Sequence, residues 1–359
     1  MAEQKQPRQE TMTSAERMGA LMMGQRPDHI PILPFAGGFC AKIVGMPIAR
    51  IYDDPEKSFW AQMWTQELLG YDGAPMFGYA SFGGWEFGGE IRMPKGEFEQ
   101  APMITRYPAR SPEEVEALEI PDLATAGSIP MTMESNRILE RFGMPVMVMA
   151  IASFTFAGNV SGVEQLCRWT IKQPEVAHML LRKVTDFSKR LIDYFVDSFP
   201  GHPLSGGAGG ASEANQIISP KQFEEFALPY QKELHEHLIA RGIRSIFCHI
   251  CGEQNLNLPL WKQVPFGDRG ILSFGHEVDL LDAIEMFGDQ HIIAGNVEPQ
   301  VIQNGTWQDV YELAKACIEK AKDAPGGYIL MAGCDVPPQA PVFNIYALKK
   351  AVMDFGFYD

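Results

Sequence analysis

His249 and Cys251 are separated by one residue in the segment 245–252, SIFCHICG, and Cys334 lies in the segment 331–338, MAGCDVPP. Imidazole nitrogen and thiolate sulfur are donors that zinc binds readily, at roughly 2.0–2.1 Å and 2.3 Å. Three protein ligands leave a fourth coordination position for a substrate, whereas a structural zinc site is usually closed by four. We therefore take His249, Cys251 and Cys334 as candidate zinc ligands.

The elements around these residues decide between a metal site and simple packing. Side chains i and i+2 of a strand share a face, so His249 and Cys251 point together and Cys248 points away. The pair alone favours packing, because buried cysteines are common and often inert. Cys334 favours a metal site because it stands at the end of a second apolar run.

The other cysteines and histidines are interpreted as structural. Six cysteines scattered through a long chain do not resemble a disulfide framework, which indicates a reducing compartment. His235 and His237 are expected on a solvated helix face, and His276 either lines the site or caps a loop. Packing roles are expected for Cys40, Cys167, Cys248 and Cys317.

Short apolar runs alternate with amphipathic segments along the chain. The runs predict eight strands, at 30–35, 73–77, 144–151, 203–206, 245–251, 271–274, 291–295 and 327–332. Helical patterns cover 14–23, 56–69, 162–170, 175–199, 220–241, 280–286 and 307–324. Strand alternating with helix predicts a parallel sheet, and eight repeats predict a closed (β/α)₈ barrel with its catalytic mouth at the C-terminal ends of the strands.

A doubly wound sheet is the alternative, but no G-x-G-x-x-G turn follows the first strand. Residues 1–12 are predicted to be a disordered tail and residues 13–359 a single barrel domain. A long insertion, residues 78–130, follows the second strand. The aromatic and glycine-rich segment 76–89 suits an aromatic substrate or a planar cofactor, or else a packed loop or subunit contact.

Composition narrows the class of partner. The chain has 359 residues and a formal net charge of −15, from 30 basic and 45 acidic residues, which argues against nucleic acid and anionic membrane surfaces. No apolar run reaches the roughly 18 residues of a membrane span. The N-terminus lacks the apolar core of a signal peptide. We predict a cytoplasmic protein.

Polar residues at other strand ends complete the candidate site. Asp335 follows Cys334 directly, and Glu213 lies in the glycine-rich segment 206–215. Asn296 and Glu298 follow the seventh predicted strand. We predict catalytic or substrate-contacting roles for all four, with a solvated position as the alternative for Glu213.

Several segments together resemble the uroporphyrinogen decarboxylase superfamily along nearly the whole chain. The resemblance implies the (β/α)₈ barrel of that superfamily. The matching segments are 24–31 (GQRPDHIP), 156–162 (FAGNVSG), 218–230 (ISPKQFEEFALPY), 295–299 (GNVEP) and 326–338 (GGYILMAGCDVPP), followed by Pro341 and Asn344.

Within the superfamily, the chain is similar to the zinc-dependent corrinoid methyltransferases. The decarboxylases carry an arginine-rich turn after the first strand, where this chain has 35–41, FAGGFCA, without arginine. The methyltransferases carry an H-x-C pair and a distant cysteine as zinc ligands, a pattern that maps onto His249, Cys251 and Cys334. The resemblance implies Zn²⁺ as cofactor and a corrinoid (cobalamin) carried by a separate partner protein.

The resemblance allows two directions of transfer. In O-demethylase members a methyl group moves from an aryl methyl ether (methoxyarene) to Co(I) of the corrinoid protein, with zinc as Lewis acid at the departing oxygen. This is our leading prediction, because segment 77–89 is similar to those members. The alternative is transfer from a methyl-corrinoid protein to a thiol such as coenzyme M. A tetrapyrrole decarboxylase and a non-enzymatic barrel are further alternatives, and a homo-oligomer is left open.

Overall fold

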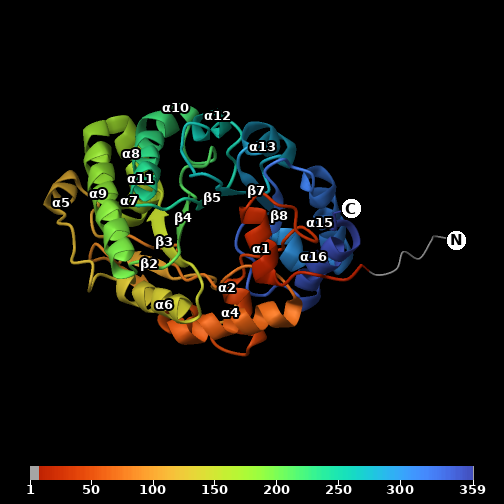
Figure 1. Ribbon diagram of the computed structural model, residues 1–359. Helices are drawn as coiled ribbons and strands as arrows, with labels where there is room; N and C mark the ends of the chain where they lie inside the picture. Colours follow the sequence, from red (N-terminus) through yellow and green to blue (C-terminus); the bar gives the residue numbers. More distant parts are fainter. Residues whose placement is uncertain (1–7, 359) are drawn as a thin grey trace.

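The computed structural model describes residues 8–358, in which strands and connecting segments form a ring that helices surround (Figure 1). Six parallel strands pair in the order β3-β4-β5-β6-β7-β8, and β1 pairs with β2 in a separate antiparallel sheet. The strands are β1 (Glu90–Arg92), β2 (Met103–Arg106), β3 (Val146–Ile151), β4 (Leu204–Gly210), β5 (Ile246–Ile250), β6 (Ile271–Phe274), β7 (Ile292–Val297) and β8 (Tyr328–Ala332).

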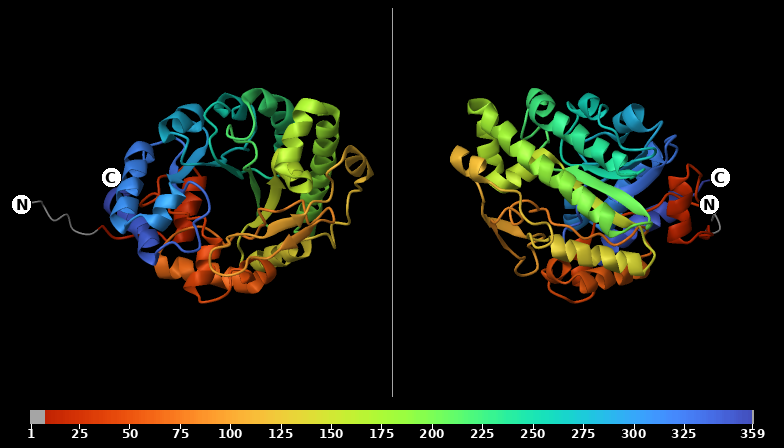
Figure 2. Two further views of the ribbon diagram at one scale, coloured as in Figure 1. Left: turned by 180° about the vertical axis from the view of Figure 1, so that it is seen from behind. Right: turned by 60° about the vertical axis from the view of Figure 1, so that its left-hand side comes forward.

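Helices cover the outside of this ring in both further views of the molecule (Figure 2). None of the helices in residues 8–358 is both long and apolar enough to span a bilayer. The helices are α1 (Ser14–Met22), α2 (Gly37–Ile43), α3 (Arg50–Asp53), α4 (Pro55–Leu69), α5 (Pro112–Ala117), α6 (Ile129–Arg141), α7 (Ser153–Ser161), α8 (Val163–Lys172), α9 (Pro174–Ser198), α10 (Pro220–Gln222), the π-helical turn η1 (Phe223–Ala227), α11 (Leu228–Ala240), α12 (Leu258–Trp261), α13 (Leu280–Phe287), α14 (Pro299–Asn304), α15 (Trp307–Ala321) and α16 (Val342–Phe355).

Local sequence explains where several predicted helices begin and break. Thr13 caps α1, and its side chain and that of Glu16 satisfy each other's backbone N–H groups in a capping box. The predicted helix 220–241 is present, but η1 interrupts it. Pro229 follows this turn and lacks the N–H that a regular α-helix needs, which explains the local change of hydrogen-bond pattern.

The predicted first and second strands are not regular strands, and this part of the prediction is wrong. Residues 30–35 touch the sheet through an isolated parallel bridge between Ile32 and Leu330 of β8. On the other side of residues 30–35, the Asp72 N–H donates to the Ile32 carbonyl at 2.7 Å. This bond places the start of the predicted second strand, 73–77, next to the predicted first strand. The chain therefore follows the course of a (β/α)₈ barrel, with two strand positions filled by irregular backbone.

Prolines and one glutamine explain this irregularity. Pro31, Pro34 and Pro75 have no N–H and cannot donate to a neighbouring strand. Farther along, the Gln62 side chain of α4 takes the place of a strand neighbour. It donates to the Met76 carbonyl and accepts from the Met76 N–H, both at 2.9 Å. These backbone groups are thus satisfied without a sheet ladder.

The long insertion, 78–130, is ordered and contains the β1–β2 hairpin. A buried carboxylate ties it together, since Glu86 is only 3% exposed. Glu86 accepts from the Gly83 N–H at 2.6 Å, and from the Ser128 N–H and hydroxyl at 2.9 and 2.6 Å. The aromatic segment is therefore tied to Ser128, near the far end of the insertion, rather than free in solvent.

Helix α1 closes the end of the barrel opposite the predicted mouth. Leu21 packs in a buried cluster with Ile271, Ile292 and Ile329, which stand at the beginnings of β6, β7 and β8. The N-terminal ends of parallel strands in such barrels usually serve stability rather than chemistry. The site is therefore expected at the other end, where β5 and β8 finish.

A buried charge network holds α1 in place. The Arg17 guanidinium is 2% exposed and pairs with Asp28 at 2.8 Å, Asp72 at 2.6 Å and Glu10 at 3.0 Å. Glu10 belongs to the tail that we predicted to be disordered, so the end of that tail is bound to the barrel. The prediction for residues 1–7 lies outside the described residues.

Candidate metal centre

The three predicted metal ligands meet at the C-terminal ends of β5 and β8. His249 is in β5, where it pairs in register with Ser273 of β6. Cys251 directly follows β5, and Cys334 comes two residues after β8. Cys248 points to the opposite face and is fully buried in the main hydrophobic core. The side chains of β5 therefore alternate as its sequence predicts, with Cys248 facing the core and His249 facing the candidate metal centre.

The spacing of the donor atoms fits a single shared metal ion. One ligand atom from each of His249, Cys251 and Cys334 lies within 4.8 Å of the others. The two sulfur atoms are 3.8 Å apart. Two thiolates bound tetrahedrally at about 2.3 Å would place their sulfurs about 3.8 Å apart. A disulfide would need about 2.05 Å, so the spacing matches a shared ion.

His249 is oriented by a serine that sequence reasoning missed. Its Nδ1 lies 3.0 Å from the Ser273 hydroxyl oxygen, whereas its Nε2 is buried without a hydrogen-bond partner. An unpaired buried nitrogen costs free energy unless a ligand satisfies it. Histidine ligands commonly donate through their second nitrogen to such an outer partner. The available signal was Ser273 itself, a polar residue inside the apolar run of β6.

The two thiols differ in acidity. The hydrogen bond from Cys251 holds the pKa of the Cys334 thiol at about 4, and His249 acts in the same direction. That same hydrogen bond and burial raise the pKa of the Cys251 thiol. The shared hydrogen bond therefore favours the thiolate form of Cys334 beside the protonated thiol of Cys251. Metal binding would release the second proton.

Glycines allow the chain to approach the ligands closely. A Cβ at Gly209 of β4 would lie 2.8 Å from the backbone oxygen of His249 and 3.2 Å from its Cβ. A Cβ at Gly333 would lie 2.7 Å from the backbone nitrogen of His276. At Gly209, the glycine-rich segment 206–215 therefore leaves room for the backbone and Cβ of His249.

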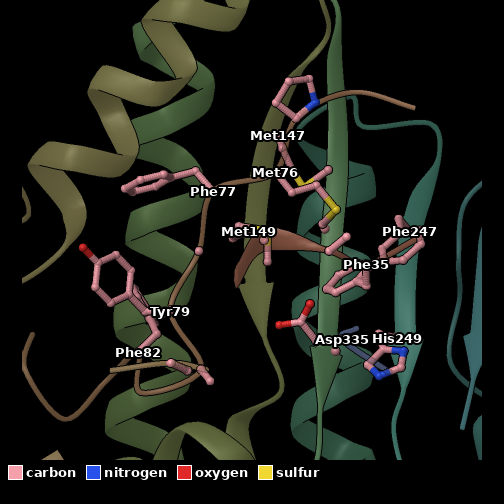
Figure 3. Close-up of a pocket in the computed structure, with 18 of the residues that line it drawn as sticks. Phe35, Met76, Phe77, Tyr79, Phe82, Met147, Met149, Phe247, His249 and Asp335 are labelled. Carbon is pink, nitrogen blue, oxygen red and sulfur yellow. The ribbon is translucent and has the colours of Figure 1, made fainter. Parts of the chain in front are cut away.

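A cavity of about 370 Å³ opens beside the three candidate ligands. Its wall includes all of them, together with aromatic and methionine side chains of the segments 33–40 and 71–82 and of β3 and β5. Figure 3 shows three methionines between two groups of aromatic rings, with His249 and Asp335 toward one end. The labelled apolar residues are Phe35, Met76, Phe77, Tyr79, Phe82, Met147, Met149 and Phe247.

Among the four predicted catalytic residues, Asp335 lines the cavity. Its Oδ1 is buried without a hydrogen-bond partner, and burial raises the pKa of this carboxyl to about 7. Glu213 is 2% exposed and accepts from the Thr155 N–H at 2.8 Å and from its hydroxyl at 2.7 Å. Burial raises the pKa of Glu213 as well. Thr155, rather than Glu213, reaches the cavity wall.

The other two predicted residues lie away from the cavity wall. The Asn296 amide donates to the carbonyls of Gly275 and Val278, at 3.0 and 2.7 Å, and so ties β7 to the loop after β6. Glu298 approaches the His276 ring nitrogen at 4.0 Å and is partly exposed. Their predicted catalytic roles stay predictions, and their contacts suit positioning of the β6 and β7 loops.

The expected solvated position of His235 is wrong. This ring is fully buried and contacts the Gln231 side chain and the Pro265 carbonyl, both at 2.7 Å. Desolvation lowers the pKa of His235 to about 4. In the sequence, His235 stands beside the polar residues Glu236 and His237. The loop before β6 covers that part of α11.

Comparison with known proteins places the chain in a family. The family model described as uroporphyrinogen decarboxylase (URO-D) matches residues 13–355. The chain belongs to the uroporphyrinogen decarboxylase (URO-D) family. A solved structure, a methyltransferase from Methanosarcina mazei, superposes with a TM-score of 0.77 and covers 96% of this chain and 99% of its own, at 21% identity. This likeness supports the (β/α)₈ fold.

Curated relatives of this chain include methyltransferases and a decarboxylase. A methylated-thiol–coenzyme M methyltransferase of Methanosarcina mazei is 28% identical over 258 residues, which are 70% of this chain and 64% of that protein. The methylcobamide:CoM methyltransferase MtaA of Methanosarcina barkeri is 24% identical over 94% of this chain and 97% of its own length. A uroporphyrinogen decarboxylase of Coxiella burnetii is 21% identical, over 70% of each chain.

Proposed function

We propose that this protein is a zinc-dependent methyltransferase that moves a methyl group between a corrinoid protein and the heteroatom of a small substrate. The observation that carries the proposal is the convergence of His249, Cys251 and Cys334 beside the cavity, with sulfurs 3.8 Å apart. The names of the methyltransferase relatives support sulfur as the heteroatom, since they mention a thiol or CoM. Transfer from a methyl-corrinoid to a thiol is therefore our first candidate.

The residues at the cavity would have distinct roles in the proposed reaction. His249, Cys251 and Cys334 would hold the ion, and Ser273 would keep His249 in the tautomer whose Nε2 faces it. When bound, zinc would act as a Lewis acid that lowers the pKa of the substrate heteroatom. Asp335 would contact the substrate from the cavity wall.

The transfer balances without a further reactant. For the thiol direction, the cobalt–carbon bond of the methyl-corrinoid breaks and a sulfur–carbon bond forms. The cobalt keeps the electron pair and becomes Co(I), and the thiol proton passes to solvent. For an in-line displacement, the thiol sulfur and the corrinoid cobalt would lie on opposite sides of the methyl carbon.

Demethylation of a methoxyarene is the second candidate, and the aromatic cavity wall favours it. Phe35, Phe77 and Phe82 would pack well against an aryl ring. A decarboxylase is disfavoured, because neither the segment 35–41 nor any described residue of the cavity wall supplies an arginine or lysine for substrate carboxylates.

Spectroscopy of cobalamin tests the proposal directly. Zinc-loaded protein would be mixed with methylcobalamin and benzenethiol, and loss of the methyl–cobalt absorption would be followed under anoxic conditions. In parallel, cob(I)alamin with 2-methoxyphenol would report the reverse direction. We expect turnover in at least one direction, and its loss when zinc is removed with a chelator. Absence of zinc-dependent change in both assays would refute the proposal.

A further inference from the structure

We propose that the cavity selects a neutral, mainly apolar substrate of aromatic size and discriminates against small anionic thiols such as coenzyme M. This inference rests on the proposed function and concerns the body of the substrate, not the heteroatom at the metal. It departs from the relatives named for coenzyme M, which is 2-mercaptoethanesulfonate and carries a permanent negative charge.

The described cavity wall has no cationic side chain that could bind an anion. Among the described residues that line it, none is lysine or arginine. A divalent zinc ion with two thiolates and a neutral imidazole has no net charge, so the metal centre would not compensate. The acidic side chains of the wall outside the candidate ligand set are those of Asp72 and Asp335. A sulfonate would therefore lose its hydration without gaining a cationic partner.

The tyrosines of the wall are already engaged. The Tyr52 hydroxyl donates to the Gln100 carbonyl at 2.7 Å. The Tyr79 hydroxyl donates to the Tyr52 carbonyl. The Tyr71 hydroxyl lies 3.6 Å from the sulfur of Cys40. Each ring thus presents its apolar body to the cavity, while its polar end is bound within the protein.

The amide and hydroxyl side chains of the wall are engaged in the same way. Gln62 and Gln66 bind backbone groups of the segment 73–76. Thr132 donates to a backbone carbonyl at 3.1 Å, and Thr155 donates to the buried Glu213 carboxylate at 2.7 Å. A substrate with several polar groups would have to break these bonds, whereas an apolar one would leave them intact.

A polar atom of the wall without a hydrogen-bond partner lies near the candidate metal centre. The Asp335 Oδ1 is buried and has no hydrogen-bond partner. Aliphatic, methionine and aromatic side chains supply much of the remaining wall, with Met147 and Met149 in the middle of the view (Figure 3). A volume of about 370 Å³ lies within the range of small-ligand sites. An aryl body next to one methylated heteroatom matches this distribution.

Two methyl thioethers test the inference because they share the CH₃–S group and differ in the rest. Methyl phenyl sulfide is neutral and aromatic, and 2-(methylthio)ethanesulfonate is anionic. Their dissociation constants would be measured by calorimetric titration of the protein as purified and after chelator treatment. We expect the sulfide to bind at least tenfold tighter. Equal or tighter binding of the sulfonate would overturn the inference, and so would failure of the sulfide to bind up to its solubility limit.

A charge introduced into the wall gives a second, independent measurement. Met149→Lys should tighten binding of the sulfonate at least tenfold and weaken binding of the sulfide. Met179→Lys is the matched control, because Met179 is exposed on α9 and the same charge there should change neither constant. If Met149→Lys folds, by circular dichroism, and leaves the sulfonate affinity unchanged, wall charge does not govern selection.

The outcome is separable from that of the proposed function. Binding that prefers the sulfide, without zinc-dependent methyl transfer, would support the inference and reject the methyltransferase. Methyl transfer that prefers 2-mercaptoethanesulfonate over benzenethiol would support the methyltransferase and reject the inference.

Discussion

The sulfur atoms of Cys251 and Cys334 lie 3.8 Å apart although 83 positions of sequence separate them. Cys251 follows β5 and Cys334 follows β8, and two further strands lie between them in the sheet. In a flat sheet these strand ends would be far apart, because neighbouring strands are about 4.8 Å apart. Curvature of the sheet into a barrel brings them together, so the candidate metal centre is a product of closure.

Replacement of either cysteine should abolish stoichiometric zinc. Cys251→Ser and Cys334→Ser each remove one soft thiolate, and we expect zinc content per chain to fall at least about tenfold, since even outer partners of metal ligands contribute 10–100-fold in affinity. Elemental analysis of the purified proteins measures this. Cys167→Ser is the control, because Cys167 lies on α8 outside the cluster. Unchanged zinc in Cys251→Ser would contradict the assignment.

Ser273→Ala should weaken zinc binding without removing a ligand. The hydroxyl lies 3.0 Å from the His249 Nδ1 and orients the ring. Loss of such an outer partner typically costs roughly 10–100-fold in metal affinity. Competition with a chromogenic chelator measures the change. Ser205→Ala on β4 is the matched control, since its hydroxyl bonds to a Val146 carbonyl instead. Equal affinities in the two variants would show that Ser273 does not orient His249.

Arg17→Met should destabilise the fold strongly. It would leave Asp28 and Asp72 buried, at 5% and 1% side-chain exposure, without their cationic partner. Breaking a buried pair in this way costs about 3–5 kcal/mol. Urea denaturation measures the free energy of unfolding. Arg26→Met is the control, because its pair with Asp323 is exposed at 68% and 71% and such pairs contribute about 0–1 kcal/mol. Similar losses in both variants would exclude a special role for the network.

Acid should destabilise the protein partly through His235. Its pKa is lowered from 6.5 to about 4 in the fold, since burial disfavours the charged ring. Below pH about 6.5 the unfolded chain binds a proton that the folded one does not, so stability falls as pH drops toward 4, by up to about 3 kcal/mol. Unfolding free energies at pH 7 and 5 measure this loss. His235→Gln should show a smaller loss, and an equal loss would exclude this histidine.

Residue types and periodicity were enough to predict several features of this protein. The period of 2 in β5 predicts that His249 and Cys251 share a face. Capping residues and amphipathic patterns predict helices such as α1 and α15 within a few residues of their observed limits. These features depend on near neighbours in the chain, whose geometry is set by the backbone itself.

Other features depend on partners that are distant in sequence. The segment 73–77 has the composition of a strand, but Gln62 of a neighbouring helix satisfies its backbone, so no ladder forms. His235 has polar neighbours in sequence, but the loop that contains Pro265 covers it. In both cases a tertiary contact supplies a hydrogen bond that the local pattern does not encode.

The sequence by itself determined which residues are candidate zinc ligands and that strands and helices alternate around them, because those properties reside in side-chain chemistry and local periodicity. The tertiary structure alone decided that Ser273 reaches His249 and that the polar groups of the cavity wall are bound within the protein. Those facts follow from barrel closure and side-chain packing, which set the distances between residues far apart in the chain.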